Sequence, residues 1–202
     1  MLAAERRGPA TPALGTHARR SGIAPDSKRR VGIRAAELIN PGATVILDGG
    51  TTGQAVAAAL PSDLRATIIT HSPTTAAALV DHTAVDIIVL GGRLHKRSAC
   101  ACGAAAAEAA RGISADLYLL VVAGIHPKEG LTNGDLDEAA MRRILVSRAA
   151  DTYVLGSIEK IGTVAPYAVV SLSEVAGLVT DAPAEHPAIR QFRAQGVNVI
   201  SA

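Results

Sequence analysis

The chain has 202 residues, a hydrophobic content of 49% and a formal net charge of +2 at pH 7. This length and composition predict one domain of about 150 to 200 residues, or a core with an extension, that can build a full hydrophobic core. Because no apolar run approaches the roughly 18 to 20 residues that cross a bilayer, and because the N-terminus lacks the apolar core of a signal peptide, we expect a cytoplasmic protein with no membrane contact.

Aromatic residues and cysteines are scarce. One Phe, three Tyr and no Trp argue against a protein that binds single-stranded nucleic acid by stacking its bases. Cys100 and Cys102 are too close in sequence for an easy unstrained disulfide, and no neighbouring His or Cys completes a zinc set. We therefore expect reduced, structural thiols, no metal site and no cofactor.

Charge is distributed unevenly along the chain. Residues 1–34 contain eight Lys or Arg against two Asp or Glu, whereas residues 35–202 contain twelve against sixteen. The basic residues of the first part stand among Gly, Pro, Ser and Thr, a composition that buries too little apolar area to fold by itself. We predict a basic flexible tail or linker over residues 1–26 and an α/β domain over residues 27–202. The tail is a solvated linker or a weak nucleic-acid arm, and it contains no helix-turn-helix pattern.

From residue 27 onward, helical and strand patterns alternate along the chain. Helices are predicted at Lys28–Ile39, Ala55–Leu60, Thr74–Val80, Ala104–Arg111, Glu138–Ala150 and Ala188–Ala194. Strands are predicted at Thr44–Leu47, Ala66–Thr70, Val85–Leu90, Asp116–Val122, Thr152–Leu155, Ala168–Val170, Gly177–Thr180 and Val197–Ile200. Repeated β-α-β units with right-handed crossovers predict an open, mainly parallel sheet with helices on both faces.

A loop rich in glycine and threonine follows the first strand, whose unbroken apolar residues are typical of a strand buried on both faces. Gly49 and Gly50 permit backbone angles that other residues resist, and Thr51 or Thr52 is expected to cap the next helix. Such a loop presents free N–H groups and the positive end of a helix dipole to an anion, with phosphate as the obvious guest. The alternative is an ordinary strand-to-helix turn that contains glycines.

The other predicted strands also end in loops with polar residues. Ligands of open parallel sheets bind beyond the carboxyl ends of the strands, so these loops are expected to converge. They are Asp48–Thr52, Thr70–Ser72, Gly91–Arg93, Ala123–Ile125 and Gly156–Lys160. Their Gly, Thr and Ser residues, together with Arg93 and Lys160, predict a pocket for a small polar anion.

Several short motifs occur in a fixed order from about Ser27 to the C-terminus. They are Asp48-Gly49-Gly50-Thr51-Thr52, Thr70-His71, Leu90-Gly91-Gly92, Ser98 with Gly103, Gly130-Leu131-Thr132, Glu138 with Arg142, and Glu159-Lys160-Ile161-Gly162. In order and spacing the chain resembles the C-terminal effector domain of the DeoR family of bacterial transcriptional repressors. The resemblance implies a fold similar to ribose-5-phosphate isomerase and glucosamine-6-phosphate deaminase, and a phosphorylated sugar or related metabolite as the effector.

The glycine- and threonine-rich loop after the first strand is where we expect the phosphate of this effector to bind. It is expected on the N–H groups of Gly50, Thr51 and Thr52 and on the threonine hydroxyls. Lys160 and Arg93 are expected to add positive charge.

The rest of the effector is expected to meet Asp48, His71 and Glu138, which would bind sugar hydroxyls, with Gly92 and Gly124 in the adjoining loops. No catalytic residue is expected. His71 stands where the family usually has Asn, and it is equally compatible with a hydrogen-bonded loop residue.

Regulators of this kind pair with symmetric operators, so we expect a homo-oligomer that contacts DNA only through a helix-turn-helix domain absent from this chain. The alternative is a sugar-phosphate isomerase or deaminase of the same fold. Asp48, Asp116 and Glu138 supply carboxylates for such an enzyme, but the Asp-Gly-Ala-Asp and Lys-Gly-Gly-Gly patterns of ribose-5-phosphate isomerase are missing.

Overall fold

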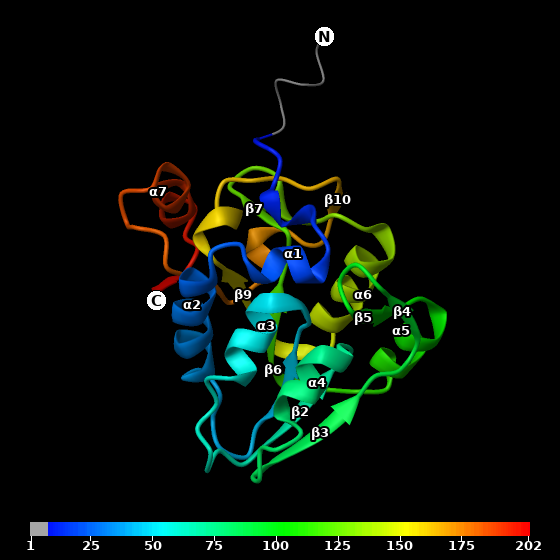
Figure 1. Ribbon diagram of the computed structural model, residues 1–202. Coiled ribbons are helices and arrows are strands. Elements are labelled where there is room, and N and C mark those ends of the chain that lie inside the picture. The colour runs from blue at the N-terminus through cyan, green and yellow to red at the C-terminus, as the bar shows by residue number, and fades with distance from the viewer. Residues whose placement is uncertain (1–7) are drawn as a thin grey trace.

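The apolar runs of the sequence form parallel strands that pair into one sheet, as the computed structural model of residues 8–202 shows (Figure 1). The strands are β1 (Thr44–Leu47), β2 (Ala66–Thr70), β3 (Val85–Val89), β6 (Ala115–Val121), β9 (Ala149–Gly156), β11 (Gly177–Thr180) and β12 (Val199–Ser201). Their order in the sheet is β12-β11-β9-β6-β1-β2-β3, and every pair is parallel. The predicted open parallel sheet is confirmed.

Helices cover both faces of this sheet. They are α1 (His17–Ser21), α2 (Pro25–Ala36), α3 (Gly50–Ala57), α4 (Pro73–Leu79), α5 (Ala104–Arg111), α6 (Leu136–Val146) and α7 (Pro187–Ala194). One hydrophobic core lies between the sheet and α2, α3 and α4, and contains Val45 and Leu47 of β1. The other lies under α5, α6 and α7 and contains Ile46, because successive side chains of a strand point to opposite faces.

Most predicted elements lie where the sequence patterns place them. The ranges of β1, β2, β11 and α5 are those predicted, and α6 and β9 differ from their predictions by a few residues at each end. The α6 boundary follows from Asp135, whose side chain accepts a hydrogen bond from the backbone N–H of Glu138 and so caps the helix.

The start of α3 differs from the prediction. The helix begins at Gly50 and not at Ala55, with Gly49 as the N-cap in an extended conformation and without a side-chain cap. Thr51 and Thr52 therefore lie inside the first turn, and their predicted role as caps is wrong. Gly50 has a φ of 87°, in the left-handed region that favours glycine, and this angle lets the chain turn from β1 into the helix.

Two small antiparallel sheets lie beside the main sheet, and one of their strands overlaps the predicted strand Ala168–Val170. One is the pair β4 (Arg93–His95) and β5 (Cys100–Cys102), and the other has the order β10 (Tyr167–Ala168), β8 (Gly130–Asn133), β7 (Gly124–His126). Strands of two to four residues carry too little alternation to be recognised, since tertiary pairing defines them.

The segment before α2 packs on the domain. It contains η1 (Pro12–Leu14) and α1, and Ala10 forms a parallel bridge with Val164. The predicted flexible tail is thereby corrected for residues 8–26, whereas residues 1–7 lie outside the described part of the chain. Composition underestimates how ordered this segment is, because its order comes from hydrogen bonds to the rest of the fold and not from a hydrophobic core of its own.

The sheet reverses its winding between β1 and β6. From β1 the chain proceeds to β2 and β3 on one side, and the later strands β6, β9, β11 and β12 extend on the other. Such a switch point opens a crevice at the carboxyl ends of the two central strands. Across residues 8–202, no helix combines the length and hydropathy needed to cross a bilayer.

Candidate functional site

A small cavity lies at the carboxyl end of β6, between α3, the loop after β9, the start of α2 and the segment before α2. Its volume is about 20 Å³, close to the space that one water molecule occupies. It is lined by Ala13, Arg20, Ile23, Lys28, Thr51, Thr52, Val121, Val122, Glu159 and Lys160. We call it the cation-lined cavity, because Arg20, Lys28 and Lys160 supply three positive side chains.

The N-terminus of α3 forms one wall of the cation-lined cavity. Thr52 is fully buried in the first turn, and its hydroxyl accepts a hydrogen bond of 3.0 Å from Lys160 Nζ. The first backbone N–H groups of a helix lack partners within the helix and carry partial positive charge. This wall therefore has the chemistry of an anion site, as the loop pattern predicts.

Positive charge in the cation-lined cavity exceeds the negative charge beside it. Lys28 and Lys160 are about 5% and 4% exposed, and the nearest carboxylate is Glu159, whose Oε1 is 3.9 Å from Lys28 Nζ. Burial lowers the pKa of Lys160 to about 8, against the opposing effect of Glu159 and with the help of the neighbouring Lys28 and Arg20. Buried cations without matching anions are costly, and a bound anion would relieve the imbalance.

A charge-balanced network lies next to the cavity, deeper in the fold. Asp48 Oδ2 accepts hydrogen bonds from Tyr118 Oη at 3.0 Å, Val121 N at 2.9 Å and Arg142 Nε at 3.0 Å. The other oxygen, Oδ1, accepts from Gly49 N at 2.7 Å. Both oxygens of this fully buried carboxylate thus have protein donors, which hold the loop between β1 and α3 in place.

Arg142 joins this carboxylate to a second one. Its Nη1 donates to Glu138 Oε2 at 3.2 Å, and Asn133 Nδ2 donates to the same oxygen at 2.9 Å. His95 Nδ1 lies 2.6 Å from Glu138 Oε1. Burial alone would raise the pKa of Glu138, but Arg142 and the hydrogen-bond donors lower it to about 2. We call this set the Asp48–Arg142–Glu138 network, in which Arg142 pairs with both carboxylates.

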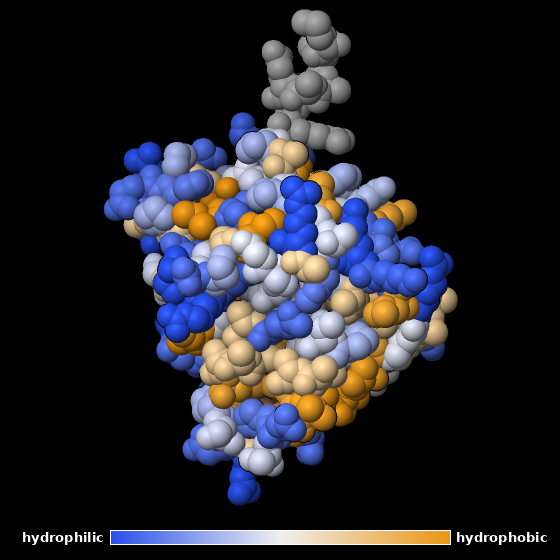
Figure 2. Space-filling view, in the orientation of Figure 1, coloured by the Kyte–Doolittle hydropathy of each residue, from blue (hydrophilic) through white to orange (hydrophobic). Residues whose placement is uncertain are grey.

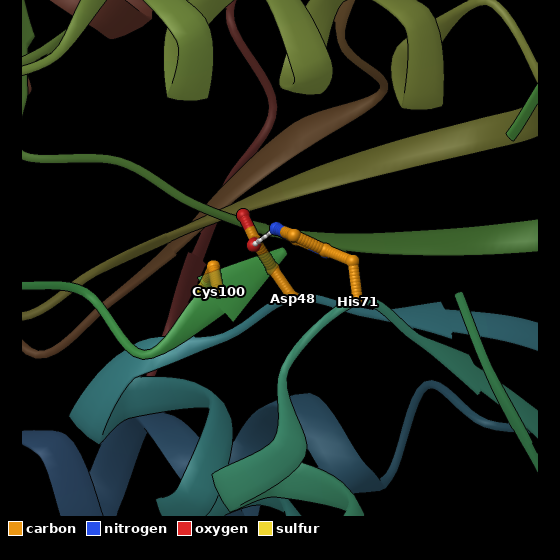
Figure 3. Close-up of side chains that lie close together, drawn as sticks. All are labelled: Asp48, His71 and Cys100. Carbon is orange, nitrogen blue, oxygen red and sulfur yellow. Dashed lines mark ion pairs between the residues drawn. The ribbon is translucent and has the colours of Figure 1, made fainter. Parts of the chain in front are cut away.

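His71 and Cys100 lie close to Asp48, which stands between them in Figure 3. His71 Nε2 is 3.4 Å from Asp48 Oδ1, neither ring nitrogen has a hydrogen-bond partner among the described residues, and burial lowers the pKa of the ring. One donor atom from each of the three lies within 4.8 Å of the others. However, burial raises the pKa of the Cys100 thiol to about 12, and Asp48 is already committed to its donors. The groups present therefore favour packing of His71 and Cys100 against Asp48 over a metal centre.

The structure brings only some of the predicted ligand residues to the cavity. Thr51, Thr52 and Lys160 line the cation-lined cavity, and Gly50 begins the helix there. Asp48, His71 and Glu138 belong to the adjacent buried groups described above.

Three further predicted positions lie outside the cavity lining. Arg93 is exposed on β4 and Gly92 packs on Ala106. Gly124 packs on Thr163. The loops that carry these residues follow β3 and β6 as predicted, but none of the three residues lines the cavity.

Arg20 and Lys28 were not predicted as site residues, because composition assigned Arg20 to the tail and Lys28 only to the start of a helix. A local signal for order did exist. Thr16 accepts from the N–H of Arg19 as the cap of α1, and Pro25 stands in the first turn of α2. Cap residues and an N-terminal Pro indicate helix starts, although they do not reveal what a helix packs against.

Comparison with known protein families gives one match that covers most of the chain. The family described as "DeoR C terminal sensor domain" matches residues 23–182. The repressor GlcR of Bacillus subtilis is 32% identical over 156 residues, which make up 77% of this chain and 60% of that protein. The regulator GlpR of Haloferax volcanii is 28% identical over 87% of this chain and 68% of its own length. The chain thus spans roughly two thirds of these relatives, both named as HTH-type regulators.

Solved structures share the fold at low sequence identity. The δ subunit of eIF2B from Chaetomium thermophilum has a TM-score of 0.54 and 14% identity, covering 81% of this chain and 58% of that one. Ribose 5-phosphate isomerase A from Methanocaldococcus jannaschii has a TM-score of 0.50 and 15% identity, covering 67% and 54%. Both likenesses concern the fold alone, which agrees with the predicted similarity to ribose-5-phosphate isomerase.

Proposed function

We propose that this chain, which belongs to the DeoR C-terminal sensor domain family, senses a phosphorylated sugar or related metabolite by binding its phosphate in the cation-lined cavity. The observation that carries the proposal is the excess of buried positive charge at the N-terminus of α3. Among the relatives, one from Escherichia coli is named glycerol-3-phosphate regulon repressor, 29% identical over 78% of this chain and 63% of that protein.

In the bound state, the phosphate would accept hydrogen bonds from the N–H groups of Gly50, Thr51 and Thr52. Lys160 would turn from the Thr52 hydroxyl to the phosphate, and Lys28 would add charge from the opposite wall. A cavity of about 20 Å³ is too small for a phosphate group, so binding requires the surrounding walls to move apart.

The rest of the effector would extend toward Glu138. A second small cavity, of about 10 Å³, lies there and shares Ala13 and Arg20 with the first. Glu138 and Asn133 line it and offer polar contacts for a hydroxyl group. Asp48 has no free oxygen, so we assign it to positioning the loop, with His71 packed behind it.

We propose a sensor and not an enzyme. An aldose–ketose isomerase needs a carboxylate that takes a proton from the substrate. Both oxygens of Asp48 already accept hydrogen bonds from protein donors. Glu138 is paired with Arg142 and has a pKa of about 2, which makes it a weak base. The test is incubation with pentose and hexose phosphates in deuterated water, followed by NMR. We expect binding without exchange of the proton next to the carbonyl, and steady exchange would show an isomerase.

The partners follow from the family. We propose that the chain works in the cytoplasm as a homo-oligomer, and that a helix-turn-helix domain outside these residues contacts DNA. The edge of the sheet offers an apolar surface for self-association over α4 and β3, where Val80, Ile88 and Val89 are about 72%, 45% and 50% exposed (Figure 2). Light scattering tests this: Ile88→Lys should lower the molar mass, and an unchanged mass would place the interface elsewhere.

Calorimetry with inorganic phosphate and a panel of sugar phosphates tests the central proposal. The Thr51→Ala, Thr52→Ala double variant loses both hydroxyls and should bind more weakly by about tenfold or more. Thr83→Ala, an exposed threonine far from the cavity, is the matched control and should bind like the wild type. Equal affinity for the double variant and the control would show that the phosphate binds elsewhere.

A further inference from the structure

We propose that residues 9–24 form a strap that closes over the bound phosphate, and that Arg20 of this strap contacts the ligand directly. The inference rests on the proposed phosphate site and assigns to it a mobile wall and a further cationic ligand. The strap consists of η1 and α1 with their flanking residues, and it crosses the front of the molecule above α3 in Figure 1.

The first end of the strap is held by backbone hydrogen bonds. Val164 N donates to Pro9 O at 2.9 Å, and Thr11 N donates to Val164 O at 3.1 Å. The Thr11 hydroxyl, which is buried, donates to the carbonyl of Ala123 just after β6. This anchor fixes one end at the edge of the site.

The second end contains a strained joint. Ala24 has φ 44° and ψ 53°, a left-handed conformation that residues with a side chain disfavour. Lys28 Nζ donates to the carbonyl of Arg20 at 2.6 Å and to that of Ile23, at the end of α1. Lys28, a cation of the proposed phosphate site, thus binds the strap directly. A movement of its ammonium group toward a ligand would therefore alter the hydrogen bonds at the end of α1.

The middle of the strap is held weakly. Its exposed residues include Pro12, Thr16, Ala18 and Arg19, and α1 contains no buried residue. A segment with few buried apolar contacts opens at small free-energy cost. Opening of this segment would enlarge the cation-lined cavity, since Ala13, Arg20 and Ile23 form its wall on this side.

Arg20 lies where the two small cavities adjoin, with Glu138 among the lining residues of the second one. It lines both small cavities, and a Cβ placed on Gly50 would lie 3.7 Å from its Nη1, so the guanidinium faces the N-terminus of α3. Nη2 donates to the carbonyl of Arg97 at 3.2 Å, whereas Nε is buried and has no hydrogen-bond partner among the described residues.

This guanidinium lies near the positive end of the α3 dipole and shares one cavity with Lys28 and Lys160. A phosphate among these groups would replace the repulsion between the three cations with attraction to the anion. It would also accept a hydrogen bond from Arg20 Nε, and this bond would hold the strap in place. Ligand affinity and strap closure are coupled reciprocally, so any contact that favours the open or the closed strap also changes the affinity for the ligand.

Hydrogen exchange with mass spectrometry, with and without inorganic phosphate, tests the strap, and calorimetry measures phosphate affinity separately. The variants are Arg20→Gln and the control Arg19→Gln, an exposed arginine on the same helix. In the wild type and in Arg19→Gln, phosphate should slow exchange over residues 17–23 by about tenfold or more. In Arg20→Gln, affinity should fall by about tenfold or more and the protection should be lost.

The outcomes separate the two proposals. If the wild type binds phosphate but exchange over residues 17–23 is unchanged, or if Arg20→Gln binds as tightly as Arg19→Gln, the strap is overturned and the phosphate site stands. If the wild type binds neither phosphate nor any sugar phosphate, the proposed function fails and the strap fails with it. Unchanged exchange in the anchor, residues 9–11, together with slowed exchange in α1 would support closure about that anchor.

Discussion

The Asp48–Arg142–Glu138 network and the cation-lined cavity are neighbours at the carboxyl end of β1, yet their charges are arranged in opposite ways. In the network, Arg142 lies between two carboxylates at 3.0 Å and 3.2 Å. In the cavity, the lining contains three cationic side chains, Arg20, Lys28 and Lys160, and one carboxylate, Glu159. The first region is balanced by the fold itself and the second is not.

We propose that this difference separates structural charges from ligand-binding ones. A buried ion pair whose hydrogen bonds are all made holds elements together, and removing one partner strands the other. A buried cation without a partner destabilises the fold unless a ligand supplies the missing charge. Perturbed pKa values occur in both regions, so the balance of charge, and not the shift alone, distinguishes them.

The largest expected effect comes from breaking the balanced region. Arg142→Met should lower the free energy of unfolding by about 3 to 5 kcal/mol, because Asp48 and Glu138 would remain buried without their cation. Urea unfolding followed by circular dichroism measures the change. The neighbouring Arg143→Met is the control, since Arg143 is exposed, and a loss for Arg142→Met no larger than for this control would show that the network is not structural.

The opposite result is expected in the unbalanced region. Lys160→Met should leave the free energy of unfolding unchanged or raise it, since it removes a buried charge, while phosphate affinity falls by about 1.5 to 3 kcal/mol. Calorimetry and urea unfolding on the same variant give both numbers. Lys128→Met, an exposed lysine outside the cavity, should change neither. Destabilisation of several kcal/mol by Lys160→Met would place this lysine among the structural charges.

The smallest expected effect is a pH dependence that sharpens the same contrast. The pKa of Lys160 in the folded protein is about 8, below the ordinary value of 10.5, so its charge destabilises the fold below pH 8. Stability from this group should rise as pH increases from about 8 to 10.5, because only the unfolded state then binds the proton.

Phosphate affinity should change in the other direction over the same range. As pH rises above 8, Lys160 loses its charge and affinity should fall by up to about tenfold per pH unit. Calorimetry from pH 7 to 9 measures this fall. Lys160→Met should show a flatter profile, and an equally steep one would assign the pH dependence to another group.

Much of the fold follows from local patterns in the sequence. Apolar runs at Thr44–Leu47 and Ala66–Thr70 form strands because burial on both faces needs no more than continuous aliphatic residues. The alternation with helices then predicts the parallel sheet, and Gly49-Gly50 marks the loop at its carboxyl edge. The motif order identified the family from the sequence, and the family match over residues 23–182 confirms it.

The partners of individual charges could not be predicted in this way. Asp48 and Arg142 are 94 positions apart, much farther than any periodicity of a helix or strand extends. Their contact supplies one of the hydrogen-bond donors to the Asp48 carboxylate. Arg20 and Lys160 likewise meet only through the folded strap and the loop after β9. Secondary structure is set by periodicities within a few residues, so the sequence by itself determined most of the elements, the parallel arrangement of the main sheet and the position of the glycine-rich loop after β1. Which buried charges neutralise one another depends on distances between remote segments, and only the tertiary structure decided it.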